Sequence, residues 1–120
     1  MVNKDIARLK HMLDSTIAIR TFTKGKRRGS LDKNRLLLSA ILREFEIIGE
    51  AAKNVSEKTK KQFSQIPWKE LIGMRNRLIH AYFDVDHEII WNTIREYLPS
   101  FQSEIEAVIH FFEAKQSEDA

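Results

Sequence analysis

The chain has 120 residues, enough for one domain with a moderate core, and 42% of them are apolar, as is ordinary for a globular protein. No apolar run approaches the roughly 18 residues of a membrane span, the first residues lack the apolar core of a signal peptide, and cysteine is absent, which excludes disulfides and thiol catalysis. The net charge of +3 is unevenly spread, because residues 1–35 carry ten Lys or Arg against three acids whereas residues 81–120 carry two against nine. We therefore expect a cytoplasmic protein with a basic end that could attract a polyanion.

The apolar residues recur at helical spacing, and no segment shows the alternation of apolar and polar residues that indicates β-strands. The sequence therefore predicts an all-α fold, an antiparallel bundle of four to five helices. The first helix is expected over residues 3–23, where one apolar stripe collects Ile6, Leu9, Leu13 and Ile17, with Met12 beside it.

A basic loop is expected to follow the first helix. Residues 24–30 combine two glycines with four cations, Lys24, Lys26, Arg27 and Arg28. Such a loop can contact phosphates, although a solvated connection between helices explains the same composition.

The second helix is expected to begin near Asp32, a plausible N-terminal cap. A lysine-rich stretch over residues 56–65 ends this helix, and Pro67 suits the first turn of a third helix over residues 66–81. The apolar stripe of the second helix steps alternately by three and four residues through Leu38, Ile41, Phe45, Ile48, Ala52 and Val55.

The last helical stretch follows a connection at residues 82–86, with Asp84 or Asp86 as its cap. Because its apolar stripe continues past Pro99, we expect either one kinked helix or two nearly collinear ones. The sequence thus predicts a single domain over residues 1–115 and a frayed polar tail over residues 116–120. The stripe consists of Ile90, Ile94, Tyr97, Phe101, Ile105, Val108 and Phe112.

A cluster of polar side chains lies at the C-terminal end of the third predicted helix. Arg75 and Tyr82, seven positions apart, fall close to one line at about 100° per residue. Asn76 and His80, four positions apart, stack on the adjacent line, so all four side chains can face one groove. A purely structural helix end, in which the cations complement the helix dipole, explains the spacing equally well.

The residue types in this cluster suit cleavage of an RNA phosphodiester without a metal. In that reaction a base removes the 2′-hydroxyl proton, the oxygen attacks the adjacent phosphorus, and an acid protonates the departing 5′-oxygen. His80 could be the acid or the base, and Arg75 offers the transition state a permanent charge and a planar fork of donors. Asn76 could orient His80 or a phosphate oxygen. The same Arg and His also suit plain phosphate binding.

Other residues carry weaker signals. The histidines lack metal-ligand spacing and cysteine is absent, so we expect neither a metal site nor a cofactor. Of the acids on the second helix, Glu50 is the one expected to face the groove. Gly49 and Gly73 each cost about 1 kcal/mol relative to Ala inside a helix, which indicates a close approach of helices. The remaining histidines, expected on helix surfaces, are His11, His87 and His110.

The motif around Arg75 resembles the signature of the HepT family of HEPN-domain proteins. It consists of Arg75, four residues, His80, one residue and Tyr82, preceded by Gly-Met and followed by Asp-Val-Asp. The segment Ile47-Ile-Gly-Glu-Ala-Ala-Lys53 is similar to that family's second-helix pattern, as is Trp91 early in the fourth helix. The resemblance covers residues 38 to about 100.

The resemblance implies a HEPN-like helical bundle that forms a two-fold homodimer, with the motif helices of both subunits lining one cleft. It also implies a metal-independent ribonuclease that acts as the toxin of a prokaryotic toxin–antitoxin pair. By position, it implies that Arg75 and His80 are catalytic, that Asn76 supports them, and that a partner minimal nucleotidyltransferase transfers AMP to Tyr82. With RNA as the substrate, the cations of the basic loop become candidate RNA contacts.

Two further considerations concern assembly and function. A homodimer is also expected on chemical grounds, because one Arg and one His per chain are a sparse set for acid–base catalysis and a two-fold interface supplies a second set.

The alternatives to a ribonuclease are a non-catalytic nucleotide- or RNA-binding helical module and a structural oligomerisation partner. Products with a 2′,3′-cyclic phosphate and a 5′-hydroxyl distinguish the ribonuclease from both.

Overall fold

The computed structural model describes the backbone of residues 2–81 and 85–119 and the side chains of residues 4–77 and 85–118. Every element in this part of the chain is helical, which confirms the predicted all-α class. In chain order the elements are α1 (Val2–Thr23), α2 (Ser30–Lys33), α3 (Arg35–Asn54), α4 (Glu57–Gln62), α5 (Trp68–Ala81), α6 (His87–Asn92), the π-helical turn η2 (Thr93–Tyr97) and α7 (Leu98–Asp119).

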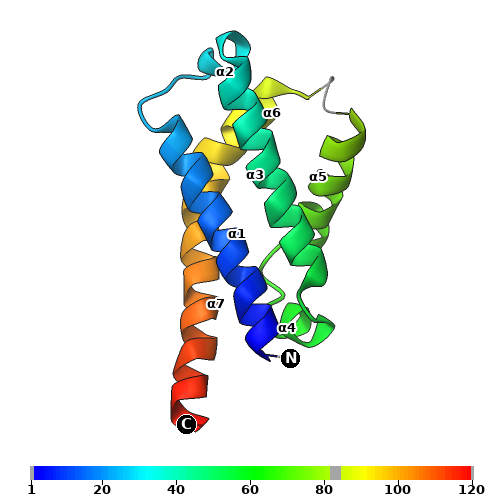
Figure 1. Ribbon diagram of the computed structural model, residues 1–120, viewed down its shortest axis with the longest axis vertical. Coiled ribbons are helices and arrows are strands. Elements are labelled where there is room, and N and C mark those ends of the chain that lie inside the picture. Colours follow the sequence, from blue (N-terminus) through cyan, green and yellow to red (C-terminus); the bar gives the residue numbers. More distant parts are fainter. Residues whose placement is uncertain (1, 82–84, 120) are drawn as a thin grey trace.

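The long helices α1, α3, α5 and α7 form the predicted antiparallel bundle (Figure 1). In that view α1 and α5 run upward, whereas α3 and α7 run downward. Helix α3 packs against both α1 and α5, and α1 also packs against α7. The short helices α2 and α4 lie at opposite ends of the bundle, in the connections that flank α3.

Capping residues explain where two of the helices begin. Asn34 caps α3, because its side chain accepts a hydrogen bond from the backbone N–H of Leu37 at 3.0 Å. The expectation that Asp32 caps this helix is wrong, since Asp32 lies inside the separate short helix α2. Asp86, one of the two predicted caps, does cap α6. Its side chain accepts hydrogen bonds from the backbone N–H groups of Glu88 and Ile89. The other alternative, Asp84, lies outside the described residues.

The core forms where the predicted stripes meet. Ile41, Phe45 and Ile48 of α3 are almost fully buried, as are the inward residues of α7. On α1 the prediction is partly wrong, because Ile17 is 41% exposed. Ile19 is buried in its place, since α1 is covered by α3 on one side and by α7 on another and therefore buries a broader arc than a single stripe.

The chain passes from α6 into α7 through the π-helical turn η2. The backbone N–H of Leu98 bonds to the carbonyl of Thr93, five residues earlier, just before Pro99. Proline has no N–H to donate and its ring crowds the preceding turn, so a wider turn ahead of it relieves both problems. In Figure 1 α6 runs obliquely into α7, which matches the expected kinked continuation. Helix α7 extends to Asp119 and so includes most of the tail that was expected to fray.

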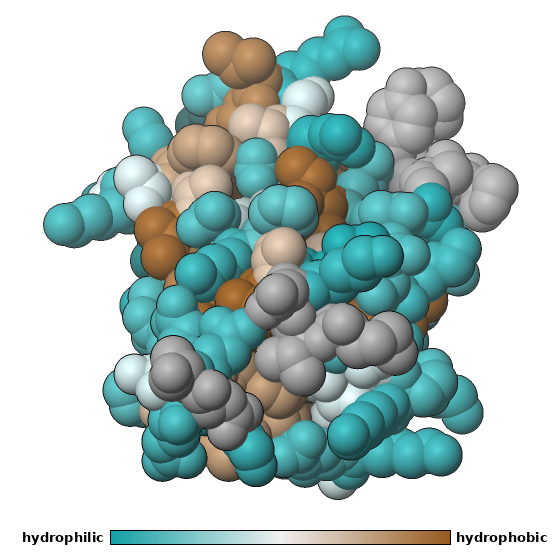
Figure 2. All heavy atoms as spheres, turned by 60° about the horizontal axis from the view of Figure 1, so that its bottom comes forward, coloured by the Kyte–Doolittle hydropathy of each residue, from teal (hydrophilic) through white to brown (hydrophobic). Residues whose placement is uncertain are grey.

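The face of the molecule at the lower end of the bundle is mostly polar. Figure 2 turns the lower end of the bundle toward the viewer and shows hydrophilic residues over most of this face, with apolar residues in separate patches. Among the described residues, no helix combines the length and the apolar character needed to cross a membrane.

Candidate active site on α3 and α5

Arg75 lies in the middle of α5, at the junction with α3. Trp68 anchors the start of α5, because its indole Nε1 donates a hydrogen bond to the carbonyl oxygen of Phe63 at 3.1 Å. Leu71, one turn further along, is buried in the core. Arg75 follows on the same line of the helix and emerges at the edge of the core, with 25% of its side chain exposed.

Gly49 on α3 allows the two helices to approach closely at Arg75. A Cβ atom added at Gly49 would overlap the Cβ atom of Arg75 and would lie 2.8 Å from the carbonyl oxygen of Leu71. The predicted close approach is therefore confirmed at Gly49. It is wrong at Gly73, where the nearest described atom, Nη1 of Arg77, lies at an ordinary van der Waals distance of 3.7 Å.

Two side chains hold the Arg75 guanidinium in place. Its Nη2 lies 2.8 Å from Oε2 of Glu50, and its Nη1 donates to Oδ1 of Asn76 at 2.9 Å. The structure thus brings three of the predicted site residues together. Both partners are exposed, and a guanidinium has five N–H donors, so Arg75 can still bind a ligand from solvent.

Arg75 and Glu50 line a groove that also extends over α1. The groove has a volume of about 360 Å³, which is in the range of small-molecule and cofactor sites. Three arginines and two glutamates line it, so the groove is polar and carries both signs of charge. Its lining residues are Arg8, His11, Arg43, Glu46, Ile47, Glu50, Ala51, Asn54 and Arg75.

The other motif residues lie in or just beyond the C-terminal end of α5. The backbone of His80 belongs to α5, whereas its side chain lies outside the described residues. Tyr82 lies outside them altogether. Their roles therefore stay predictions. Arg77 is exposed and lines a different, largely apolar cavity between α5 and α7.

The basic loop lies apart from the groove. Lys24 follows the end of α1 at Thr23, which lies fifteen residues beyond Arg8, or about 22 Å along the helix. Lys26 and Arg27 line a second cavity, of about 330 Å³, that shares no lining residue with the groove. Arg28 forms ion pairs with Asp32 at 2.6 Å and with Glu88 at 2.8 Å. The structure therefore does not bring the four loop cations to Arg75.

The remaining histidines lie on helix surfaces, as expected. His87 contacts Asp32, with Nδ1 2.6 Å from Oδ1, and this hydrogen bond, followed by that from Arg28, lowers the pKa of the Asp32 carboxyl. His110 is exposed, and His11 is exposed and borders the groove. In the described part of the chain, no group of three or more His, Cys, Asp or Glu is arranged to hold a metal ion.

The profile of the family described as "Ribonuclease HepT-like" matches residues 12–108 of the chain. The chain belongs to the HepT-like ribonuclease family. The resemblance inferred from the motif is thereby confirmed, and membership of a ribonuclease family supports RNA as the substrate. The matched range includes the whole arrangement of Glu50, Arg75 and Asn76 and excludes Arg8.

Curated relatives of this HepT-like protein carry ribonuclease names. "Putative RNase MJ1380" of Methanocaldococcus jannaschii is 35% identical over 109 residues, which are 90% of this chain and all of that protein. "Putative RNase TTE0752" of Caldanaerobacter subterraneus is 37% identical over 101 residues, 84% of this chain and 90% of that protein. "Probable ribonuclease HepT" of Thermococcus cleftensis is 46% identical over 67 residues, 56% of this chain and 61% of that protein. No solved structure matches the chain.

Sequence reasoning missed part of the groove of this HepT-like protein. Arg8 and His11 are ordinary polar positions of an amphipathic helix, and Arg43 lies among the acids of α3. Their meeting with Arg75 depends on how α1 is rotated against α3, which no local pattern specifies. The helical spacing of Arg8 and His11, three residues apart, could have shown only that they share a face.

Proposed function

We propose that this HepT-like protein is a metal-independent endoribonuclease that cleaves RNA with Arg75 and His80. The observation that carries the proposal is the position of Arg75 in the groove, where Glu50 and Asn76 fix the direction of its guanidinium. Such preorganisation is what transition-state stabilisation requires, because the donors need not reorganise as charge develops. Family membership supports the same activity.

In the proposed reaction the 2′-oxygen of the RNA attacks the adjacent phosphorus after losing its proton to a base. The P–O5′ bond breaks, and an acid protonates the departing 5′-oxygen, which leaves a 2′,3′-cyclic phosphate and a 5′-hydroxyl. His80 serves as the acid or the base. Arg75 donates to the non-bridging oxygens of the phosphorane, while Glu50 and Asn76 support Arg75. The basic loop, through Lys24, Lys26, Arg27 and Arg28, contacts RNA beyond the cleavage site.

The first test combines product analysis with variants. Arg75→Ala should lower kcat by about 10²- to 10³-fold and His80→Ala by about 10²- to 10⁴-fold, with helical circular dichroism retained. Arg77→Ala is the matched control, because Arg77 is an exposed arginine of the same helix that lies outside the groove. Mass spectrometry should find cyclic phosphate ends. Tight, salt-sensitive RNA binding without any cleavage would instead identify a non-catalytic binding module.

We further propose that the protein is the cytoplasmic toxin of a toxin–antitoxin pair, controlled at Tyr82 by a partner nucleotidyltransferase. AMP attached to the Tyr82 hydroxyl would place negative charge and bulk two residues beyond His80, which would repel an incoming RNA phosphate and engage Arg75. The toxin would be inactivated without unfolding.

Intact mass spectrometry after co-expression with that partner tests the control by AMP. The mass should rise in AMP-sized steps that map to Tyr82, and Tyr82→Phe should stay active and resist neutralisation. Modification at another residue, or AMP-dependent silencing of Tyr82→Phe, would contradict the proposal. Loss of activity in Tyr82→Phe alone would assign the hydroxyl to catalysis or RNA contact.

A further inference from the structure

Basic side chains from α1 and α3 border the groove beside Arg75, and the proposed reaction does not use them. Arg8 and His11 come from α1, and Arg43 comes from α3. The groove therefore continues across the bundle from Arg75 on α5 to Arg8 on α1. A strand of RNA has a phosphate at every nucleotide, so a groove of this kind can contact more than the phosphate that is cleaved.

Among the described side chains, no acid pairs with Arg8. Arg75 pairs with Glu50 at 2.8 Å and Arg43 pairs with Glu46 at 3.5 Å, so both glutamates of the groove have a cationic partner. Across the described side chains, by contrast, Arg8 has neither an ion pair nor a hydrogen bond. A half-buried arginine without an anionic partner is suited to bind an anionic ligand, above all a phosphate, which matches its planar fork of donors.

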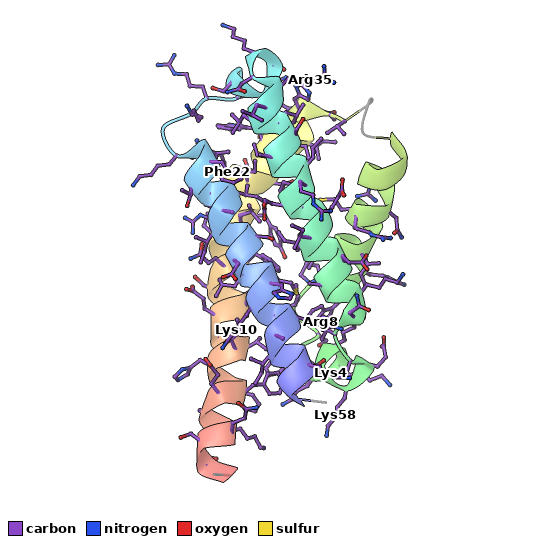
Figure 3. All side chains as sticks on the ribbon, viewed as in Figure 1. Lys4, Arg8, Lys10, Phe22, Arg35 and Lys58 are labelled. Carbon is purple, nitrogen blue, oxygen red and sulfur yellow. The ribbon has the colours of Figure 1, made fainter. Side chains whose placement is uncertain are left out.

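The packing of α1 directs Arg8 toward the groove. Leu9 and Met12 are fully buried, which fixes the rotation of α1 in the bundle. Lys10 then lies on the α7 side, where its ammonium pairs with Glu113 at 3.1 Å. Figure 3 shows Lys10 on the α7 side of α1 and Arg8 on the side of α3 and α4. Arg8 thus faces the groove because of how the core is packed.

We infer that Arg8, with His11 and Arg43, forms a phosphate-binding subsite that holds an RNA phosphate next to the one at Arg75. This inference rests on the proposed ribonuclease function and extends it to substrate positioning. None of the lining residues is Phe, Tyr or Trp, and the arginines of the groove match phosphate oxygens, which are the same at every nucleotide. We therefore assign the subsite to the RNA backbone.

The test uses the full chain and a fluorescent single-stranded oligonucleotide with 2′-O-methyl groups, which lacks the nucleophile and cannot be cleaved. Binding is measured by anisotropy from low to moderate salt. Each phosphate contact contributes about 0.7 to the slope of log K against log salt for single strands. Arg8→Ala should reduce the slope by that amount and weaken binding about tenfold. Arg8→Lys, which keeps the charge, should restore the slope.

Lys10→Ala is the matched control, because Lys10 is an exposed cation of the same helix that faces α7. It should leave both slope and affinity unchanged. An Arg8→Ala variant that is helical by circular dichroism and binds with the wild-type slope would overturn the inference. A competition experiment with a free mononucleotide gives a second check. If the mononucleotide binds as tightly as the oligonucleotide and depends equally on Arg8, the site is a nucleotide pocket and the inference is overturned.

Cleavage assays separate this inference from the proposed function. If Arg8→Ala alters the salt slope but the wild-type protein cleaves no RNA, the phosphate subsite is supported and the ribonuclease proposal fails. If the wild-type protein cleaves RNA but Arg8→Ala neither raises KM nor changes the slope, the subsite is wrong and the ribonuclease proposal is unaffected. Support for both requires that Arg8→Ala raise KM more for a long oligonucleotide than for a dinucleotide, which has only the scissile phosphate.

Discussion

At the scale of single residues, a missing side chain is as important to the candidate site as the charged ones. Gly49 lets α3 approach α5 so closely that Arg75 emerges directly beside Glu50, the next residue of α3. The two groups can then pair at 2.8 Å without extending away from the bundle. The glycine costs helix stability, about 1 kcal/mol relative to alanine, so its presence has to be explained by this contact.

The two helical glycines give opposite predictions for the same substitution. Gly49→Ala should lower the free energy of unfolding by about 1–3 kcal/mol, because the new Cβ overlaps Arg75 and the backbone of Leu71 cannot yield cheaply. Gly73→Ala should raise it by up to about 1 kcal/mol, because the described surroundings leave room and alanine favours the helix. Urea denaturation of both variants checks this. Equal effects in the two would show that helix propensity alone governs both positions.

At the scale of elements, buried polar contacts hold the ends of the helices together. Asp5 of α1 accepts hydrogen bonds from the Oγ of Ser56 and the Oγ1 of Thr59, both at 2.6 Å, and from the backbone N–H of Ser56 at 2.9 Å. Burial raises the pKa of the Asp5 carboxyl, but the hydrogen bonds lower it further than burial raises it. The ionised carboxylate therefore ties α1 to the start of α4.

The lowered pKa of Asp5 makes this tie dependent on pH. Because the carboxyl has a lower pKa in the folded state than its ordinary value of 3.8, the stabilisation is present above that value and is lost as pH falls through the folded pKa. Asp5→Asn should cost about 1–3 kcal/mol at pH 7, and the difference from wild type should shrink below about pH 3.8. Urea unfolding over a pH series measures this difference in the free energy of unfolding. Asp14→Asn replaces an exposed acid of the same helix and is the control for the substitution itself, which should leave stability at pH 7 nearly unchanged.

A second contact between elements fixes the basic loop. Arg95 of η2 donates from Nη2 to the carbonyl oxygens of Thr23 at 2.8 Å and Lys26 at 2.9 Å, and its guanidinium lies 4.4 Å from the ring centre of Trp91. These bonds restrain the start of the loop even though its lysines are exposed.

Removing this restraint should expose the loop to protease. Arg95→Ala should increase the rate of trypsin cleavage between residues 24 and 28 by about fivefold, the factor that corresponds to about 1 kcal/mol of lost local stability. Mass spectrometry of timed digests measures the rate. Lys115→Ala, on the distant part of α7, should leave it unchanged, and an unaltered rate in Arg95→Ala would show that other contacts hold the loop.

The elements themselves were largely predictable from the sequence, and the reason is periodicity. The bounds of α1 and the stripe of α3 follow from apolar spacing, which is a local property. The sequence predicted Asp32 as the cap of α3, whereas the structure has Asn34 there. Both residue types are good caps, and the short helix α2 has no apolar period that would have revealed it. Local chemistry also indicated Gly49 as a contact, but Gly73 carried the same signal without the contact.

The site was predictable where its residues are close in sequence or where a local feature points to a contact. Arg75 and Asn76 come from one helix, so helical geometry placed them together. Glu50 required the additional clue of the adjacent glycine. Arg8 lies far away along the chain and reaches the groove through the packing of α1 on α3, which no spacing rule specifies. The missed contribution of α1 therefore depends on tertiary packing that has no local sign in the sequence.

At the scale of the whole molecule, the fold packs the acidic C-terminal segment against one side of the basic first helix and leaves Arg8 on another side. Helix α7 lies wholly within the acidic C-terminal segment and packs along α1 on the side away from α5, where Glu113 pairs with Lys10 at 3.1 Å. The groove, with an Arg8 that pairs with none of the described acids, lies on the opposite side of α1. An RNA strand should therefore be attracted to the groove and repelled by α7, which favours one face of the bundle for binding.

Assembly is the last prediction, and it follows from how little chemistry one chain offers. In the proposed reaction, a single Arg75 and a single His80 would have to supply both proton transfers and all the charge stabilisation unless a second chain contributed its own pair. A two-fold dimer with α5 of both chains at the interface would provide that second pair. Light scattering at micromolar concentration should therefore give twice the chain mass of 14.1 kDa. Cleavage per chain should also fall when the protein is diluted below the dissociation constant of the dimer, at constant RNA. A mass of 14.1 kDa with undiminished activity per chain would show that one chain suffices.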